Sequence, residues 1–142
     1  MTDSAVDNVD ILIIGAGPVG LTLHLALAAG GQQSLLLDRR PLAALQADPR
    51  ALALSHGARE LLEQINSWPT RAATPIETIH VSQKSGFGRT LIKHTDYRLP
   101  ALGYVVRYRH LAAALAANLS AGCLLAETEI LDIAPDDDGA RS

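Results

Sequence analysis

The sequence predicts an α/β fold, in which a βαβ unit of a parallel sheet carries a small β-hairpin addition. Apolar runs at 9–14 and 34–37 flank an apolar helical segment, and a glycine-rich turn separates the first run from that segment. Short apolar runs of this kind are typical of strands buried in a parallel sheet. The chain has 142 residues, 48% of them hydrophobic and 19% charged, which suffices for one domain and excludes a disordered protein.

Polar residues, a proline and glycines mark the ends of the first predicted elements. Residues 1–8 are polar and predict a flexible leader. The run at 9–14 predicts a strand buried on both faces, because it is nearly all apolar and rich in β-branched residues. A helix is expected over 18–29, since proline is tolerated in a first turn and glycines follow its end. The run at 34–37 predicts the second parallel strand.

The next stretch has weaker periodicity. Residues 39–54 predict an irregular connection with one helical turn, because prolines and charges interrupt the pattern. Ser55 can cap a helix that runs to about residue 66. Arg59 and Glu63 are four residues apart, which predicts an ion pair on that helix.

The remaining elements alternate short strands with one further helix, and no linker or repeat divides the chain. Pro and Gly flank two runs that predict a hairpin, and leucines at every fourth position predict a helix facing the core. In order, we expect hairpin strands at 76–81 and 89–93 joined through 86–88, a strand at 104–106, a helix from 107 or 108 stopped by Gly122, a parallel strand at 123–126 and a turn at 136–139.

The glycine-rich turn has the pattern G-x-G-x-x-G and spans Gly15, Ala16, Gly17, Pro18 and Gly20. Between a strand and a helix, this pattern indicates a Rossmann-like dinucleotide-binding βαβ unit. The first glycine permits the tight turn, the second lets the backbone approach a diphosphate, and the third allows close helix–strand packing. The helix N-terminus would face the phosphates. The alternative is a turn that only connects the two elements.

Asp38 ends the second strand at the position where dinucleotide-binding folds carry an acid for the ribose hydroxyls. A carboxylate there disfavours a phosphorylated ribose, because two negative groups would meet. The site therefore favours FAD or NAD over NADP. Asp38 alone does not separate FAD from NAD.

Two arginines are further candidate ligands. Arg50 lies in a connection after a proline, and Arg107 lies where a strand meets a helix. Either guanidinium could reach a phosphate or a flavin edge. The alternative for each is a solvated surface arginine. We identify no metal site and no catalytic residue in the sequence.

The composition limits which partners the protein can bind and in which cellular compartment it can lie. The net charge of −3 gives no support for a nucleic-acid partner. A lone cysteine, Cys123, fits a reducing compartment, and no apolar run approaches the ~18 residues that span a bilayer. We therefore expect a cytoplasmic protein, with peripheral association at the inner membrane face or with a biosynthetic complex left open. The sequence does not indicate an oligomeric state.

Three blocks of sequence resemble FAD-dependent hydroxylases of ubiquinone biosynthesis, the 2-polyprenyl-6-methoxyphenol hydroxylase family with the p-hydroxybenzoate hydroxylase fold. Many flavoproteins share the first block, whereas the second and third are more specific. The blocks lie at 10–39, which contains the glycine motif, at 48–55, which reads DPRALALS, and at 100–111, which contains PALGYVVR.

The resemblance implies roles for individual residues. Gly15, Gly17 and Pro18 match the turn over the FAD diphosphate. Asp38 matches the ribose acid, which is usually Glu in the family, and Arg39 follows it near the adenosine. Two further positions match cofactor contacts, namely Arg50 at the FAD phosphates and Arg107 at the flavin. The implied reaction hydroxylates a polyprenyl phenol with O₂, and NAD(P)H reduces the flavin.

Members of the resembled family are far longer than this chain. Residues 9–142 therefore match the N-terminal part of an FAD-binding domain, without the substrate domain. We expect exposed apolar patches, and weak or no retention of FAD by this chain alone. Two alternatives remain open, namely an NAD-dependent oxidoreductase domain and a non-enzymatic domain for nucleotide binding or assembly.

Overall fold

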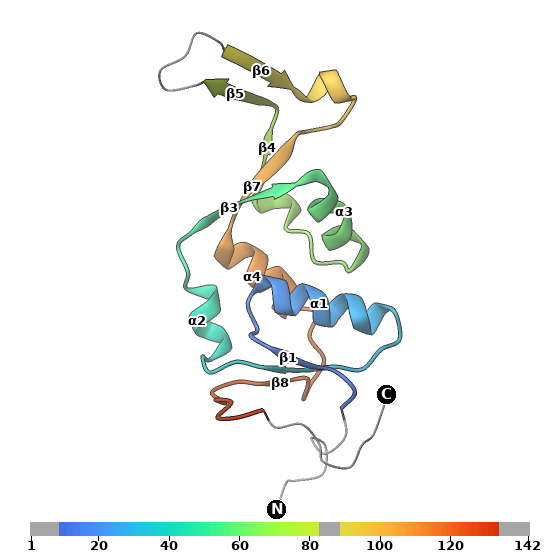
Figure 1. The fold of residues 1–142 in the computed structure, drawn as a ribbon, viewed down its shortest axis with the longest axis vertical. Helices are drawn as coiled ribbons and strands as arrows, with labels where there is room; N and C mark the ends of the chain where they lie inside the picture. Colours follow the sequence, from blue (N-terminus) through green and yellow to red (C-terminus); the bar gives the residue numbers. More distant parts are fainter. Residues whose placement is uncertain (1–8, 83–88, 134–142) are drawn as a thin grey trace, which may run out of the picture.

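The computed structural model describes residues 9–82 and 89–133. Figure 1 shows a parallel sheet at one end, with helices α1 and α4 packed beside it. An antiparallel sheet follows beyond α4, and a hairpin projects from the opposite end of the molecule. The structure is α/β as predicted, although it contains an antiparallel sheet that the sequence analysis did not anticipate.

The parallel sheet has the strand order β1-β2-β8, in which β1 spans Leu12–Ile14, β2 spans Leu35–Leu37 and β8 spans Leu124–Leu125. Helix α1, at Pro18–Ala29, connects β1 to β2. All three residues of β2 are buried, as expected for a central strand covered by helices. The predicted βαβ unit and the predicted parallel strand near residue 124 are both confirmed.

The prediction that the first strand is buried on both faces is wrong. Ile13 is buried, but Leu12 and Ile14 are 50% and 59% exposed. Side chains alternate between the two faces of a strand, so these two residues share the face opposite Ile13. Strand β1 lies at the edge of the sheet. The face of β1 that carries Ile13 packs on the core.

The antiparallel sheet has the order β3-β7-β4, with β3 at Ala51–Ser55, β7 at Gly103–Arg107 and β4 at Ala73–Ile76. The prediction of an irregular connection over 39–54 is therefore wrong at its end, because β3 pairs with β7 along five residues. The alternation of Ala and Leu in β3 is a weak local signal, and a distant partner stabilises the strand. The expected helical turn is present as α2 at Leu42–Gln46.

The hairpin consists of β5, at Thr78–Ser82, and β6, at Arg89–Lys93. The strand expected at 76–81 is therefore divided, because Ile76 belongs to β4 and the chain enters the hairpin only at Thr78. The connection expected at 86–88 lies outside the described residues, as do the leader at 1–8 and the turn at 136–139. Short 3₁₀ helices precede β4 and follow β6, at Thr70–Ala72 and His94–Tyr97.

Helix α3 spans His56–Gln64, and its cap is confirmed, since the Ser55 hydroxyl accepts a 3.1 Å hydrogen bond from the Ala58 N–H. The ion pair between Arg59 and Glu63 is also confirmed, at 2.7 Å from Nε to Oε1. Helix α4 spans Tyr108–Ala116, so it ends earlier than the predicted stop at Gly122. Its core-facing stripe is present, because Leu111 and Leu115 are buried.

One surface of the fold is apolar and open. A groove of about 540 Å³ runs between α1, β3 and α3, and its lining includes Val19, Leu23, Leu54 and Leu61. The exposed apolar patches that the sequence predicts are therefore confirmed. Within the described ranges, no helix is long and apolar enough to cross a membrane.

Candidate functional site

The glycine-rich loop between β1 and α1 is tied to the end of β2. The Gly15 N–H donates a 2.7 Å hydrogen bond to the carbonyl of Leu37. Gly15 has φ +106°, a conformation that side chains rarely adopt, so the turn requires glycine at this position. The first predicted role in the motif, a tight turn, is confirmed.

Gly17 and Gly20 have different surroundings. A Cβ on Gly20 would overlap the carbonyl oxygen of Gly15, so this glycine permits the close packing of helix and loop. Gly17 has ordinary extended backbone angles, and a Cβ there would lie 3.4 Å from the Tyr108 hydroxyl oxygen as its nearest neighbour. The fold therefore accepts a Cβ at Gly17. Packing within the protein does not explain why this residue is a glycine.

The first turn of α1 begins at Pro18, which has no N–H to donate. The first backbone donor used within the helix belongs to Leu21, which bonds to the carbonyl of Gly17 at 2.9 Å. The earlier N–H groups of the turn have no intrahelical acceptor and carry the positive end of the helix dipole. This terminus therefore offers donors to an anion that approaches Gly17.

Asp38 is buried, with 6% of its surface exposed, and its carboxylate is saturated by protein donors. Oδ2 accepts hydrogen bonds from the Ala16 N–H at 2.9 Å and from Arg40 Nη2 at 3.2 Å. Oδ1 accepts from the backbone N–H and the Nε of Arg40, at 2.9 and 3.1 Å. These four donors fill the roughly four acceptor sites of a carboxylate.

This arrangement alters the role that the sequence suggested for Ala16. Ala16 is wholly buried and its N–H already bonds Asp38, so it offers no free donor to a ligand. The guanidinium that pairs with Asp38 belongs to Arg40, which the sequence analysis did not select. The hydrogen bond from the Arg40 side chain is the main cause that lowers the pKa of Asp38 to about 2, so the carboxylate is ionised at neutral pH.

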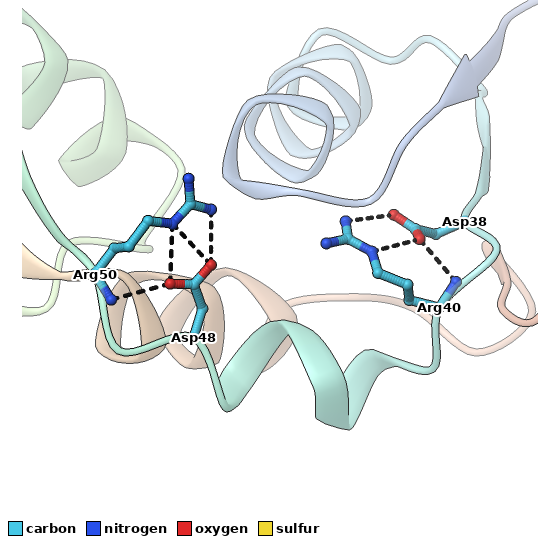
Figure 2. Close-up of polar contacts among 4 residues, drawn as sticks. All are labelled: Asp38, Arg40, Asp48 and Arg50. Carbon is cyan, nitrogen blue, oxygen red and sulfur yellow. Dashed lines mark hydrogen bonds and ion pairs between the residues drawn. The ribbon is translucent and has the colours of Figure 1, made fainter.

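A second Asp–Arg pair repeats the same local geometry at the other end of α2 (Figure 2). Asp48 accepts a 2.9 Å hydrogen bond from the Arg50 N–H, and the Arg50 guanidinium binds the same carboxylate at 2.7 to 3.0 Å. This pair raises the pKa of Arg50 and lowers that of Asp48. Unlike the first pair, it is exposed, with 65% of the Arg50 side chain accessible.

Tyr108 connects Arg50 to the glycine loop, and the sequence analysis did not select it. The Tyr108 N–H donates a 2.8 Å hydrogen bond to the carbonyl of Arg50. The Arg50 guanidinium carbon lies 5.0 Å from the centroid of the Tyr108 ring. The hydroxyl at the far end of this ring is the nearest neighbour of the space above Gly17. Arg50 is therefore linked to the loop through a buried aromatic ring.

An open pocket of about 510 Å³ lies at the carboxyl ends of β1 and β2. Its lining brings Gly15, Asp38 and Arg39 together, with Arg40 beside them and Glu129 on the segment after β8. Ligands of open α/β sheets gather at such strand ends. The segment after β8 was not predicted to contribute, because its position depends on the pairing of β8 with β2.

Arg107 lies elsewhere. It is exposed at the end of β7 and lines a separate hollow of about 320 Å³ with Thr74 and His110. None of the glycine-loop residues lines this hollow. The geometry thus brings Arg50 toward the loop and leaves Arg107 apart from it.

The arrangement has the features of a site for an extended dinucleotide. The pocket beside Asp38 and Arg39 can take a nucleoside, while the free N–H groups near Gly17 suit a diphosphate. In the described part of the chain, no group of three or more His, Cys, Asp or Glu residues could hold a metal ion.

Comparison with curated proteins gives two relatives of the same kind. The chain is 29% identical to the ubiquinone hydroxylase UbiM of Neisseria meningitidis, over 93% of this chain and 32% of the relative. It is also 29% identical to the ubiquinone hydroxylase UbiL of Rhodospirillum rubrum, over 100% of this chain and 35% of the relative. The chain therefore spans about a third of the length of these relatives.

Solved structures with the same fold include two monooxygenases. The p-nitrophenol 4-monooxygenase PnpA of Pseudomonas putida matches 90% of this chain and 34% of its own, with a TM-score of 0.69 and 17% identity. The flavin-dependent monooxygenase PieE, solved with FAD and substrate, matches 84% of this chain and 24% of its own, with a TM-score of 0.63 and 25% identity.

A family model described as an FAD binding domain matches residues 8–133, nearly the whole chain. This match agrees with the glycine loop, the buried acid after β2 and the relatives above. It resolves the choice between FAD and NAD that Asp38 left open. The chain therefore belongs to the FAD binding domain family.

Proposed function

We propose that residues 9–142 are the N-terminal part of the FAD-binding domain of a flavin-dependent aromatic-ring hydroxylase. Its substrate would be a polyprenyl phenol in ubiquinone biosynthesis, and NAD(P)H would be its reductant. The names of UbiM and UbiL support the pathway, since both are ubiquinone hydroxylases. A substrate with a polyprenyl tail would bring the whole enzyme to the inner face of a membrane as a peripheral protein.

The observation that carries the cofactor assignment is the space above Gly17. A methyl group would fit there without strain and would meet only the Tyr108 hydroxyl. A glycine that the fold itself does not need is expected where a ligand approaches the backbone closely. The FAD diphosphate would lie over Gly17 and Pro18, at the positive end of α1, with the Arg50 guanidinium as a counter-charge.

The adenosine would occupy the pocket beside Gly15, Asp38 and Arg39. Every acceptor site of Asp38 is filled by protein donors, so a ribose hydroxyl must replace at least one Arg40 donor. The Arg40 side chain is half exposed and can move away without unfolding the loop. The flavin contact suggested for Arg107 would require the ligand to extend past Arg50 to the outer face of β7.

When bound, FAD supplies the redox chemistry of the reaction with O₂. The chain's own residues would bind and orient it, because the loop, Arg50 and the buried Asp38 hold charge and donors in fixed positions. The groups that shield the reacting ring and bind the phenol would belong to the remaining two thirds of the length seen in the relatives.

Two measurements test the proposal. Titration of the purified chain with FAD and with NAD should show weak binding of FAD and none of NAD at matched concentrations. The longer protein that contains this chain should purify yellow, consume O₂ with NADH or NADPH and a polyprenyl phenol, and yield a product heavier by one oxygen atom. A colourless protein that does not bind added FAD would refute the proposal.

A further inference from the structure

We infer that the Tyr108 hydroxyl is a further ligand of the cofactor, which donates a hydrogen bond to the FAD diphosphate above Gly17. The inference rests on the proposed FAD site and adds one donor to it. In the described part of the chain, the one non-neighbouring atom within 4 Å of a Cβ placed on Gly17 is this hydroxyl oxygen, at 3.4 Å. Any group that occupies the space above Gly17 must meet that oxygen.

The hydroxyl is held in place by its own backbone and ring. Tyr108 is the first residue of α4, and its N–H bonds the carbonyl of Arg50 at 2.8 Å. The residue is 7% exposed and the Arg50 guanidinium covers one face of the ring. A donor that is already immobilised loses little conformational entropy when a ligand arrives.

Within residues 9–82 and 89–133, the hydroxyl also lacks a hydrogen-bond partner. Among the described residues it makes no side-chain hydrogen bond, whereas the hydroxyl of Tyr104, a similarly buried tyrosine in β7, accepts one from Arg59. A tyrosine that is mostly buried usually finds a partner for its hydroxyl. An oxygen of the diphosphate would provide that partner, and a hydrogen bond to a charged group is stronger than one to a neutral group.

The same contacts give Tyr108 two effects on the diphosphate. Its ring packs against the Arg50 guanidinium, and its hydroxyl supplies a neutral donor beside Gly17. These effects are separable, because Tyr108→Phe removes the hydroxyl and keeps the ring. Tyr104→Phe is the matched control, since it removes a buried hydroxyl of the neighbouring strand that does not face the loop.

The test measures FAD, ADP and adenosine binding by calorimetry for the unmodified chain and both variants. Thermal unfolding without ligand should give Tyr108→Phe and the unmodified chain similar midpoints. Tyr108→Phe should bind FAD and ADP about tenfold more weakly, as expected for one lost hydrogen bond to a charged acceptor, and adenosine equally well. Tyr104→Phe should leave all three affinities unchanged.

The outcomes separate this inference from the function on which it rests. Equal affinity of Tyr108→Phe and the unmodified chain for FAD and ADP would overturn the inference alone. An equal loss of adenosine affinity would also overturn it, because the effect would then not come from the diphosphate. Failure of the unmodified chain and of the longer protein to bind FAD would refute the proposed function, and the inference with it.

Discussion

The Asp38 carboxylate accepts a 2.9 Å hydrogen bond from the backbone N–H of Ala16, and so joins the end of β2 to the glycine loop. The Gly15 N–H bonds the Leu37 carbonyl beside it. Two adjacent hydrogen bonds therefore fix the loop in the absence of any ligand. Asp38 accordingly supports the shape of the site, in addition to the ribose contact expected from its position.

This support should depend on pH. The pKa of Asp38 is lowered from 3.8 to about 2, so the folded protein favours the ionised carboxylate. The stabilisation is complete above pH 4 and is lost as the pH falls through 2, because protonation then removes the preference. Urea unfolding should show a loss of about 2 kcal/mol between these limits from Asp38.

Variants identify the source of that loss. Asp38→Asn should lower the free energy of unfolding at pH 7 and flatten its dependence on pH between 4 and 2. Arg40→Ala should act in the same direction, because Arg40 is the main partner of Asp38. Arg39→Ala, which changes the adjacent exposed residue, should leave the acid unfolding curve unchanged. An unchanged curve for Arg40→Ala would contradict this account.

Arg50 should matter for binding and little for folding. Its ion pair with Asp48 is exposed, and exposed pairs contribute little to stability. Arg50→Ala should weaken FAD binding by about tenfold or more, because a guanidinium–phosphate contact is charge-assisted. The salt dependence of FAD affinity should also decrease.

Arg71→Ala is the matched control for Arg50→Ala, since Arg71 is an exposed arginine in a 3₁₀ helix away from the loop. Calorimetric titration at two salt concentrations distinguishes the variants. Equal FAD affinities for Arg50→Ala and Arg71→Ala would show that Arg50 is a solvated surface residue.

Two adjacent leucines in α3 should respond differently to truncation. Leu62 is 4% exposed in the core, whereas Leu61 is 41% exposed on the open apolar groove. Leu62→Ala should destabilise the chain by about 3 kcal/mol, as for other buried leucines, and Leu61→Ala by less than about 1 kcal/mol. Urea unfolding measures both. Similar losses would show that the groove is closed in solution.

The β1–α1–β2 unit could be predicted because its signals are contiguous. The apolar run, the glycines and Pro18 are neighbours in sequence, and each restricts the local backbone. The same holds for α3, which Ser55 caps. Burial of the first strand could not be predicted, since it depends on which elements cover Leu12 and Ile14.

The parts that were missed depend on contacts between distant segments. Strand β3 forms because Ala51–Ser55 pairs with β7, and the alternation of Ala and Leu in its own sequence is too weak a signal to predict a strand. Tyr108 approaches Gly17 only because α4 packs on α1. Arg40 did carry a local signal, since an Asp is followed two residues later by an Arg in both Asp–Arg pairs of Figure 2.

We attribute the glycine at position 17 to the cofactor, and the Gly17→Ala variant tests this attribution. The fold accepts this methyl group, so thermal unfolding of the ligand-free variant should match that of the unmodified chain. Gly20→Ala is the contrast, because its Cβ would overlap the Gly15 carbonyl and should destabilise the fold.

The deciding measurement is a calorimetric FAD titration of Gly17→Ala beside the unmodified chain. We expect an unchanged unfolding midpoint without ligand and an FAD affinity reduced by about tenfold or more, because the methyl group would occupy the space of the diphosphate. Unchanged FAD affinity in a folded Gly17→Ala variant would contradict it.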